Sequence, residues 1–147
     1  MERTIFHVDV NSAFLSWEAV YRMKHLGGRL DLRTVSSAVG GDVTRRHGII
    51  LAKSIPARAC GIKTGETVFS ALKKCPELVL VPPNYNLYQR SSDALIRLLK
   101  EYTPLVEQYS IDEAYMDMTE STALFGPPEV AAETIRERIL QELGFTV

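Results

Sequence analysis

The chain has 147 residues, of which 46% are hydrophobic and 24% are charged. These are the proportions of a soluble globular protein, and the length is enough for one ordinary domain with a substantial core. No apolar run approaches the roughly 20 residues that a membrane helix needs, and the N-terminus lacks the features of a signal peptide. The two cysteines, Cys60 and Cys75, show no metal-binding spacing. We therefore expect a reduced, cytoplasmic protein without membrane association.

The formal net charge of −1 hides an uneven distribution of charge along the chain. Residues 22–74 carry 11 Lys or Arg and three acids, whereas the rest of the chain carries 6 Lys or Arg and 15 acids. A basic region of this kind often binds a polyanion such as nucleic acid. Lys and Arg also solvate ordinary surfaces, so the charge alone leaves both interpretations open.

The first predicted element is a buried strand at residues 4–10, which are rich in β-branched and aromatic side chains. Asn11 or Ser12 can cap the helix that follows, whose apolar spacing runs over residues 14–24 and stops at a pair of glycines. Asp9 thereby lies at the carboxyl end of a strand, where open α/β sheets place their ligands. The free N–H groups at the start of the helix suit a phosphate in the same space.

The basic region predicts two short strands, at 34–39 and 49–52, with a turn at Gly40-Gly41-Asp42 after the first. A short helix then begins near Ser54, with a proline in its first turn, and carries Arg58. The histidines of the chain are isolated and are interpreted as surface residues, not metal ligands: His7, His25 and His47.

The acidic remainder predicts a strand, two helices and a hairpin. The apolar run 78–81 is typical of a central strand, and an apolar helical face follows between residues 88 and 102. Residues 106–118 read as two short strands around Asp112-Glu113, which predicts a hairpin with both acids at or near its tip. The last helix opens at two prolines, 127–128, and stops at a glycine.

The acidic tip is the candidate site. Two close carboxylates resist joint ionisation, and a bound divalent cation removes that penalty. The order of elements matches an α/β layer of the ferredoxin-like or palm type, in which the first strand and the hairpin can lie side by side. Asp9 would then approach Asp112 and Glu113. Three carboxylates around one point suit two hard cations, which can activate a hydroxyl and stabilise a leaving pyrophosphate oxygen. The alternative interpretation of the tip is a solvated acidic turn.

Three stretches of the sequence resemble the Y-family, or translesion, DNA polymerases: residues 6–14, 57–65 and 109–117. The resemblance extends over residues 4–147. It implies a ferredoxin-like polymerase palm, formed by residues 1–25 and 76–147, with a small inserted fingers subdomain at residues 26–75.

The resemblance also implies a function in DNA damage bypass: template-directed transfer of a nucleotide from a dNTP to a primer 3′-hydroxyl, with two Mg²⁺ ions. Asp9, Asp112 and Glu113 would be the catalytic carboxylates and metal ligands, with the carbonyl of Val10 as a further ligand. The ring of Phe14 would lie under the sugar and exclude a 2′-hydroxyl. The implied nucleotide-binding residues are Asn11, Ser12, Ala13, Phe14, Ser54 and Arg58. The implied partners are primer–template DNA, a dNTP and a sliding clamp, the last bound through regions absent here.

The sequence departs from the family pattern at three points. Ile55 stands where the family often has a Tyr, and Ile cannot donate a hydrogen bond to phosphate. Asn11 stands where many members have a second Asp. The family continues beyond Val147, so we expect an N-terminal fragment, truncated before the end of the palm, with little activity alone.

Two other functions compete with the polymerase. Residues 40–44 resemble the start of the Gly-Gly-Asp-Glu-Phe signature of diguanylate cyclases, which use a related palm, but they lack its Glu and Phe. The basic region would also serve a non-catalytic DNA-binding or regulatory remnant.

Overall fold

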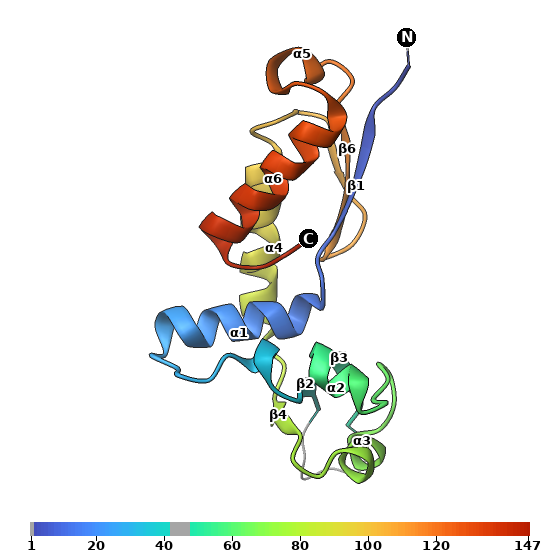
Figure 1. Cartoon of the computed structure of the whole chain (residues 1–147), viewed down its shortest axis with the longest axis vertical. Coiled ribbons are helices and arrows are strands. Elements are labelled where there is room, and N and C mark those ends of the chain that lie inside the picture. Colours follow the sequence, from blue (N-terminus) through green and yellow to red (C-terminus); the bar gives the residue numbers. More distant parts are fainter. Residues whose placement is uncertain (1, 42–47) are drawn as a thin grey trace. The chain divides into compact units, whose positions relative to one another are not determined.

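The structure is a computed structural model that describes residues 2–41 and 48–147. It divides into two compact units, residues 1–11 with 89–147 and residues 12–88, and each unit is described by itself (Figure 1). The interpretations of His47 and of the cyclase-like residues 42–44 lie outside the described residues. The palm and fingers boundaries given above remain a prediction, since the compact units divide at other positions.

The first unit is built on an antiparallel sheet with the strand order β1-β6-β5. Its strands are β1 (Ile5–Asp9), β5 (Val106–Gln108) and β6 (Glu113–Asp117). The hairpin of β5 and β6 is the predicted acidic hairpin, and β6 pairs along the whole of β1. The predicted adjacency of the first strand and the hairpin is therefore confirmed.

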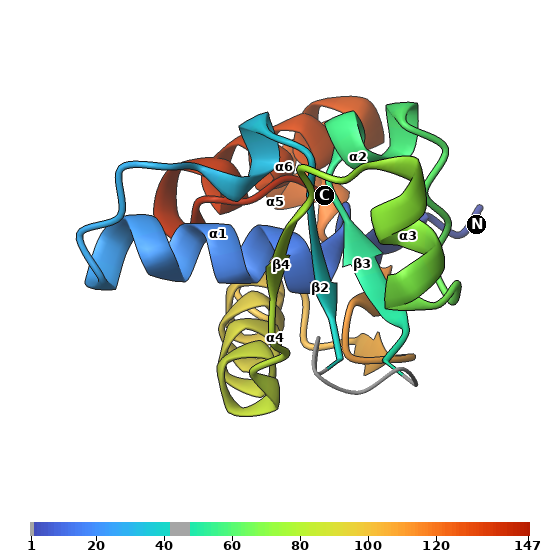
Figure 2. The same ribbon diagram turned by 90° about the horizontal axis from the view of Figure 1, so that it is seen from below.

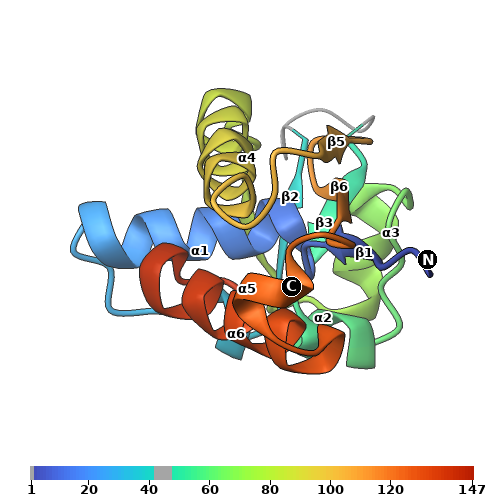
Figure 3. The ribbon, with the colours of Figure 1, turned by 90° about the horizontal axis from the view of Figure 1, so that it is seen from above.

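Helices cover one face of this sheet. They are α6 (Pro128–Leu143) and the part of α4 (Tyr85–Leu99) that belongs to this unit; Figures 1 and 3 show both on the same side of β1 and β6. A further short helix, α5 (Thr122–Phe125), has only four residues, too few for a periodic pattern in the sequence. Apolar side chains of strands and helices form the buried layer: Val8, Leu95, Leu99, Ala114, Met116, Ala131, Ile135 and Ile139.

The second unit contains another three-stranded sheet, with the order β3-β2-β4 (Figure 2). β2 (Ser37–Gly40) is antiparallel to β3 (Ile50–Lys53) and parallel to β4 (Val79–Val81). The prediction of a central strand at 78–81 is wrong, because β4 is an edge strand. A short apolar run indicates that its side chains are buried. It does not indicate whether the strand pairs with one neighbouring strand or with two.

The helices of the second unit are α1 (Ala13–His25), α2 (Ile55–Ala59) and α3 (Val68–Lys74), with a 3-10 turn η1 (Leu32–Thr34) before β2. The predicted helix start at Ser54 is confirmed, since its hydroxyl accepts a hydrogen bond from Ala57 N at 3.1 Å. Among residues 2–41 and 48–147, no helix is long and apolar enough to cross a membrane.

The predicted cap of α1 by Ser12 is not formed. Ser12 is the N-cap residue, but its φ of 44° is left-handed and its side chain makes no capping hydrogen bond. A capping side chain requires an extended backbone to reach the first free N–H groups. The side-chain amide of Asn11 donates to Thr146 Oγ1 at 3.0 Å. The end of α1 is as predicted: Gly27 has a φ of 61°, and Gly28 N donates to Arg22 O at 2.9 Å.

Candidate metal and nucleotide site

The register of β1 and β6 brings the predicted carboxylates to one end of the sheet of the first unit. Asp9 is paired directly with Glu113, and residues opposite each other in an antiparallel pair project to the same face. The backbone N–H of Val10 donates to the carbonyl of Asp112 at 3.0 Å. The end of β1 therefore lies beside both acids of the hairpin.

The pKa of Asp9 reflects the proximity of the other two acids. Partial burial raises the pKa of the Asp9 carboxyl, and the negative charges of Asp112 and Glu113 raise it further, while His7 acts weakly in the opposite direction. Carboxylates raise one another's pKa only when they are near in space. The structure thus brings together the three acids that the sequence singled out.

Two neighbouring side chains hold the hairpin acids, and neither contact was predicted from the sequence. The hydroxyl of Ser110 lies 2.9 Å from Asp112 Oδ1 and 3.1 Å from Glu113 Oε2; with one proton, it donates to one of them at a time. His7 Nε2 lies 3.1 Å from Glu113 Oε1. His7 is at the surface, as predicted, but the alternation of β1 places it on the same face as Asp9, and that signal was available in the sequence.

The acids fit a divalent cation by chemistry, although their side chains are not arranged as a finished coordination sphere. Within residues 2–41 and 48–147, no group of three or more His, Cys, Asp or Glu side chains is placed to hold a metal ion. The donors are all oxygens and carry excess negative charge, which is what hard cations require. Ser110 and His7 contact oxygens of Asp112 and Glu113, so these hydrogen bonds compete with a cation for the same oxygens.

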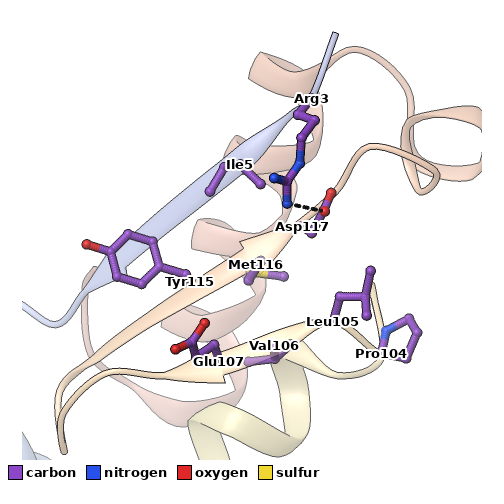
Figure 4. Close-up of a pocket in the computed structure, with 9 residues that line it drawn as sticks. All are labelled: Arg3, Ile5, Pro104, Leu105, Val106, Glu107, Tyr115, Met116 and Asp117. Carbon is purple, nitrogen blue, oxygen red and sulfur yellow. Dashed lines mark hydrogen bonds and ion pairs between the residues drawn. The ribbon is translucent and has the colours of Figure 1, made fainter. Parts of the chain in front are cut away.

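Residues of β1, β5 and β6 and the segment before β5 line a groove in the first unit (Figure 4). Ile5, Leu105 and Tyr115 are exposed in it, and the ring of His7 stacks on Tyr115 with a centroid distance of 4.5 Å. Figure 4 shows the ion pair of Arg3 with Asp117, at 3.0 Å, in the same groove. The acid site therefore opens onto an accessible surface with aromatic and apolar side chains.

The second unit carries the predicted sugar-contacting ring. Phe14 is half-buried near the start of α1 and stacks on Tyr88, with centroids 4.5 Å apart and an interplanar angle of 11°. Tyr88 is fully buried, and its hydroxyl donates to Glu18 Oε2 at 2.9 Å. Glu18 in turn accepts from Arg22 Nε at 3.3 Å. Burial and the charge of Glu18 raise the pKa of the Tyr88 hydroxyl, which keeps it protonated as a donor. Phe14 therefore rests on a rigid, hydrogen-bonded support.

The remaining predicted nucleotide ligands differ in what they can offer. Arg58 is exposed on α2 and free of steric cover, whereas Ala13 is buried and can contribute only its backbone. The hydroxyl of Ser54 donates to Val35 O and accepts from two backbone N–H groups, Ser37 N and Ala57 N. This uses its full hydrogen-bonding capacity in a site that is 2% exposed. The prediction that Ser54 binds nucleotide is therefore not supported, because its oxygen is used in folding α2 onto β2.

Comparison with known proteins identifies the family. The sequence model of the impB/mucB/samB family matches residues 8–147. The chain belongs to this family. This impB/mucB/samB chain is 50% identical, over all of its 147 residues, to the protein named DNA polymerase IV of Clostridium acetobutylicum, of which it covers 37%.

Solved structures agree with the sequence match. A Y-family DNA polymerase chimera of Dbh and Dpo4 superposes with a TM-score of 0.81 and 26% identity, over 97% of the impB/mucB/samB chain and 40% of the other. The insertion ternary complex of Dbh DNA polymerase matches with the same values. The resemblance to Y-family polymerases and the palm-and-fingers type of fold are confirmed. The chain spans about a third of the length of the curated relatives that it matches.

Proposed function

We propose that the chain is the palm and fingers of a translesion DNA polymerase that transfers a nucleotide from a dNTP to a primer 3′-hydroxyl on a DNA template. One observation carries the proposal: Asp9 is paired with Glu113 beside Asp112, in a chain that belongs to the impB/mucB/samB family. A protein that only binds DNA has no need to hold three mutually repelling carboxylates together.

In this function Asp9, Asp112 and the carbonyl of Val10 would hold divalent cations, with Glu113 as the remaining catalytic carboxylate. Mg²⁺ is the proposed ion, and two such ions would activate the primer hydroxyl and neutralise charge on the leaving pyrophosphate. The chain's own part is to keep four oxygen donors at one end of a rigid sheet. Ser110 would release the hairpin carboxylates as they turn toward the ions.

The nucleotide would be held by the second unit. Phe14 would contact the deoxyribose and leave no room for a 2′-hydroxyl, and the stack on Tyr88 would prevent the ring from moving aside. Arg58 would bind the triphosphate through charge-assisted hydrogen bonds. Asn11, Ser12 and the backbone of Ala13 lie at the start of α1 and complete the proposed nucleotide ligands. Ile55 is 79% exposed and offers only an apolar surface.

The partners proposed for the whole polymerase are primer–template DNA, a dNTP and a sliding clamp, in the cytoplasm. Solved relatives include one described as an insertion ternary complex and one as a post-insertion binary complex of Dbh DNA polymerase. We expect the 147-residue chain to show little extension alone, because it spans about a third of its relatives' length.

Nucleotide binding by this chain can be measured through its tryptophan. Trp17 is the only tryptophan in the sequence, and its ring lies 6.2 Å from Phe14 and 6.1 Å from Tyr88. A dNTP that contacts Phe14 should change the Trp17 emission, more strongly with Mg²⁺ than with EDTA. Asp112→Asn should remove the Mg²⁺ dependence, while the exposed control Asp93→Asn on α4 should keep it. No emission change for the wild type with any dNTP would contradict the proposed nucleotide site.

Catalysis is tested by joining this chain to the remaining part of the Clostridium acetobutylicum polymerase. The chimera should extend a primer; Asp112→Ala should abolish extension with DNA binding retained, and Phe14→Ala should admit ribonucleotides. If the chimera binds DNA with a steep salt dependence and never extends it, the non-catalytic alternative is supported instead. Robust extension by the 147-residue chain alone would contradict the expectation that it is inactive by itself.

A further inference from the structure

The two cysteines of the chain stand at the ends of neighbouring helices in the second unit. Cys60 is the C-cap residue of α2 and is exposed, whereas Cys75 is the C-cap residue of α3 and is 1% exposed. Figures 1 and 2 both show α2 and α3 next to each other beside β3. One thiol therefore faces solvent, and the other lies in the core.

Contacts on both sides of the cysteines join the two helix ends. Lys74, which precedes Cys75, donates from Nζ to the carbonyl of Gly61, which follows Cys60, at 3.0 Å. Ser36 Oγ lies 3.8 Å from Cys60 Sγ. The Cys75 side chain also packs in one buried cluster with residues that flank Cys60 in the sequence, Ala57 and Ile62.

The two thiols also influence each other electrostatically. Burial raises the pKa of the Cys75 thiol, and its interactions with Glu77 and Cys60 raise the pKa further, while Ser36 acts in the opposite direction. Cys75 therefore stays protonated and unreactive toward reagents in solution until Cys60 changes its chemical state.

We propose that Cys60 and Cys75 are a redox-sensitive thiol pair, in which a peroxide oxidises exposed Cys60 and buried Cys75 then closes an intramolecular disulfide between α2 and α3. In the first step the Cys60 thiolate attacks hydrogen peroxide, the O–O bond breaks, and the product is Cys60 sulfenic acid with hydroxide, which takes up the proton that Cys60 lost to give water. In the second step the Cys75 sulfur attacks the sulfenic sulfur, the S–O bond breaks, and water leaves with the Cys75 proton. One peroxide is reduced to two waters while two thiols give up two electrons and two protons.

The junction of the two helix ends, where Lys74 Nζ donates to Gly61 O, decides the product because it keeps a second thiol near Cys60. An exposed cysteine without a neighbour is oxidised past the sulfenic acid, whereas a second thiol in reach captures the sulfenic acid first. The disulfide would tie down α2, the helix that carries Arg58, two residues before Cys60. The thiol pair does not depend on the proposed polymerase function, because it is defined by contacts within the second unit alone.

The test treats the reduced 147-residue chain with hydrogen peroxide and then alkylates it in denaturant for peptide mapping. We expect the free thiols to fall from two to none, the monomer mass to fall by two hydrogen atoms, and one peptide pair linking Cys60 to Cys75, all reversed by dithiothreitol. Recovery of Cys75 as an alkylated thiol beside sulfinic Cys60, or linkage only between two chains on a non-reducing gel, overturns the proposal.

Two variants separate the steps. In Cys75→Ser, peroxide should give a Cys60 sulfenic acid that dimedone traps and that no disulfide consumes. In Cys60→Ser, the buried Cys75 should stay reduced under conditions that oxidise the wild type, and rapid oxidation of Cys75 in that variant counts against the proposed order of events. The wild-type peptide map decides the main question even if Cys75→Ser does not fold.

Discussion

Replacing Asp9 with asparagine should stabilise the metal-free chain, although Asp9 is a proposed metal ligand. Asp9 stands directly opposite Glu113, where Cβ atoms are about 5 Å apart. Two unit charges at about 5 Å repel by about 0.8 kcal/mol at the dielectric constant of water and by about 1.7 kcal/mol at half that value. Asp9 is exposed, so the lower figure applies, and Asp112 adds a further contribution. We expect a gain of about 1 kcal/mol at low salt, which shrinks as salt screens the charges.

The gain should depend on pH in one direction. The folded-state pKa of Asp9 is raised above its ordinary value of 3.8, so the folded chain binds this proton more tightly than the unfolded chain. The wild type is therefore relatively favoured below pH 3.8 and loses that stability as the pH rises through the folded-state pKa. The advantage of Asp9→Asn should be full at neutral pH and absent in acid.

Divalent metal should make the wild type more stable than Asp9→Asn. A ligand at ten times its Kd stabilises the state that binds it by about 1.4 kcal/mol, and Asp9→Asn should lose this gain together with its carboxylate. The assay is urea unfolding followed by circular dichroism, in EDTA and in Mg²⁺ at matched ionic strength, with amide exchange of β1 to localise the effect. Glu107→Gln, on the exposed face of β5, is the matched control. Lower stability of Asp9→Asn in EDTA, or a full Mg²⁺ response, would refute the shared acid site.

Three further substitutions test other parts of the structure. Hydrogen bonds and an ion pair lower the pKa of Asp117 to about 2. The Asp117 carboxylate therefore contributes stability above pH 3.8, and this contribution is lost as the pH falls toward 2. Asp117→Asn should flatten the acid limb of a plot of unfolding midpoint against pH. Tyr88→Phe removes a buried hydrogen bond to charged Glu18 and should lower the free energy of unfolding by about 1.5–3 kcal/mol, measured by tryptophan fluorescence during unfolding. Tyr85 is 59% exposed, so the control Tyr85→Phe should change the free energy of unfolding very little. Equal losses in the two variants would contradict the assigned network. Gly27→Ala places a side chain at a φ of 61° and should cost about 1 kcal/mol, measured by thermal melting; an unchanged melting temperature would mean that the end of α1 is not held in this conformation.

The backbone frame of the acid site was predictable because it depends on periodicity. A strand with Asp9 at its carboxyl end and a hairpin with two acids at or near its tip are local patterns, and the βα order limits how the two can pair. The glycine stop of α6 is an equally local signal, and these predictions are confirmed.

Features that depend on tertiary neighbours were not predictable. The position of β4 at a sheet edge depends on which strands pair with one another, not on the apolar run itself. Ser54 was predicted as a helix cap and, from the family resemblance, as a nucleotide ligand, and the sequence does not contain the tertiary contacts in which its hydroxyl accepts from Ser37 N and Ala57 N. The left-handed φ of Ser12 likewise has no signature in a serine.

The acid site contains both a feature that the sequence predicts, the strand register, and a feature that it does not predict, the orientation of the carboxylates. Strand register places Asp9 and Glu113 opposite each other whatever their side chains do, so the repulsion is imposed by the fold. The orientation of each hairpin carboxylate is set by Ser110 and His7, whose hydrogen bonds compete with any cation for the same oxygens. A cation strong enough to displace one hydroxyl and one imidazole also relieves the repulsion that raises the pKa of Asp9. Metal binding is therefore favoured by relief of the repulsion that the register imposes, and it is opposed by the hydrogen bonds of Ser110 and His7.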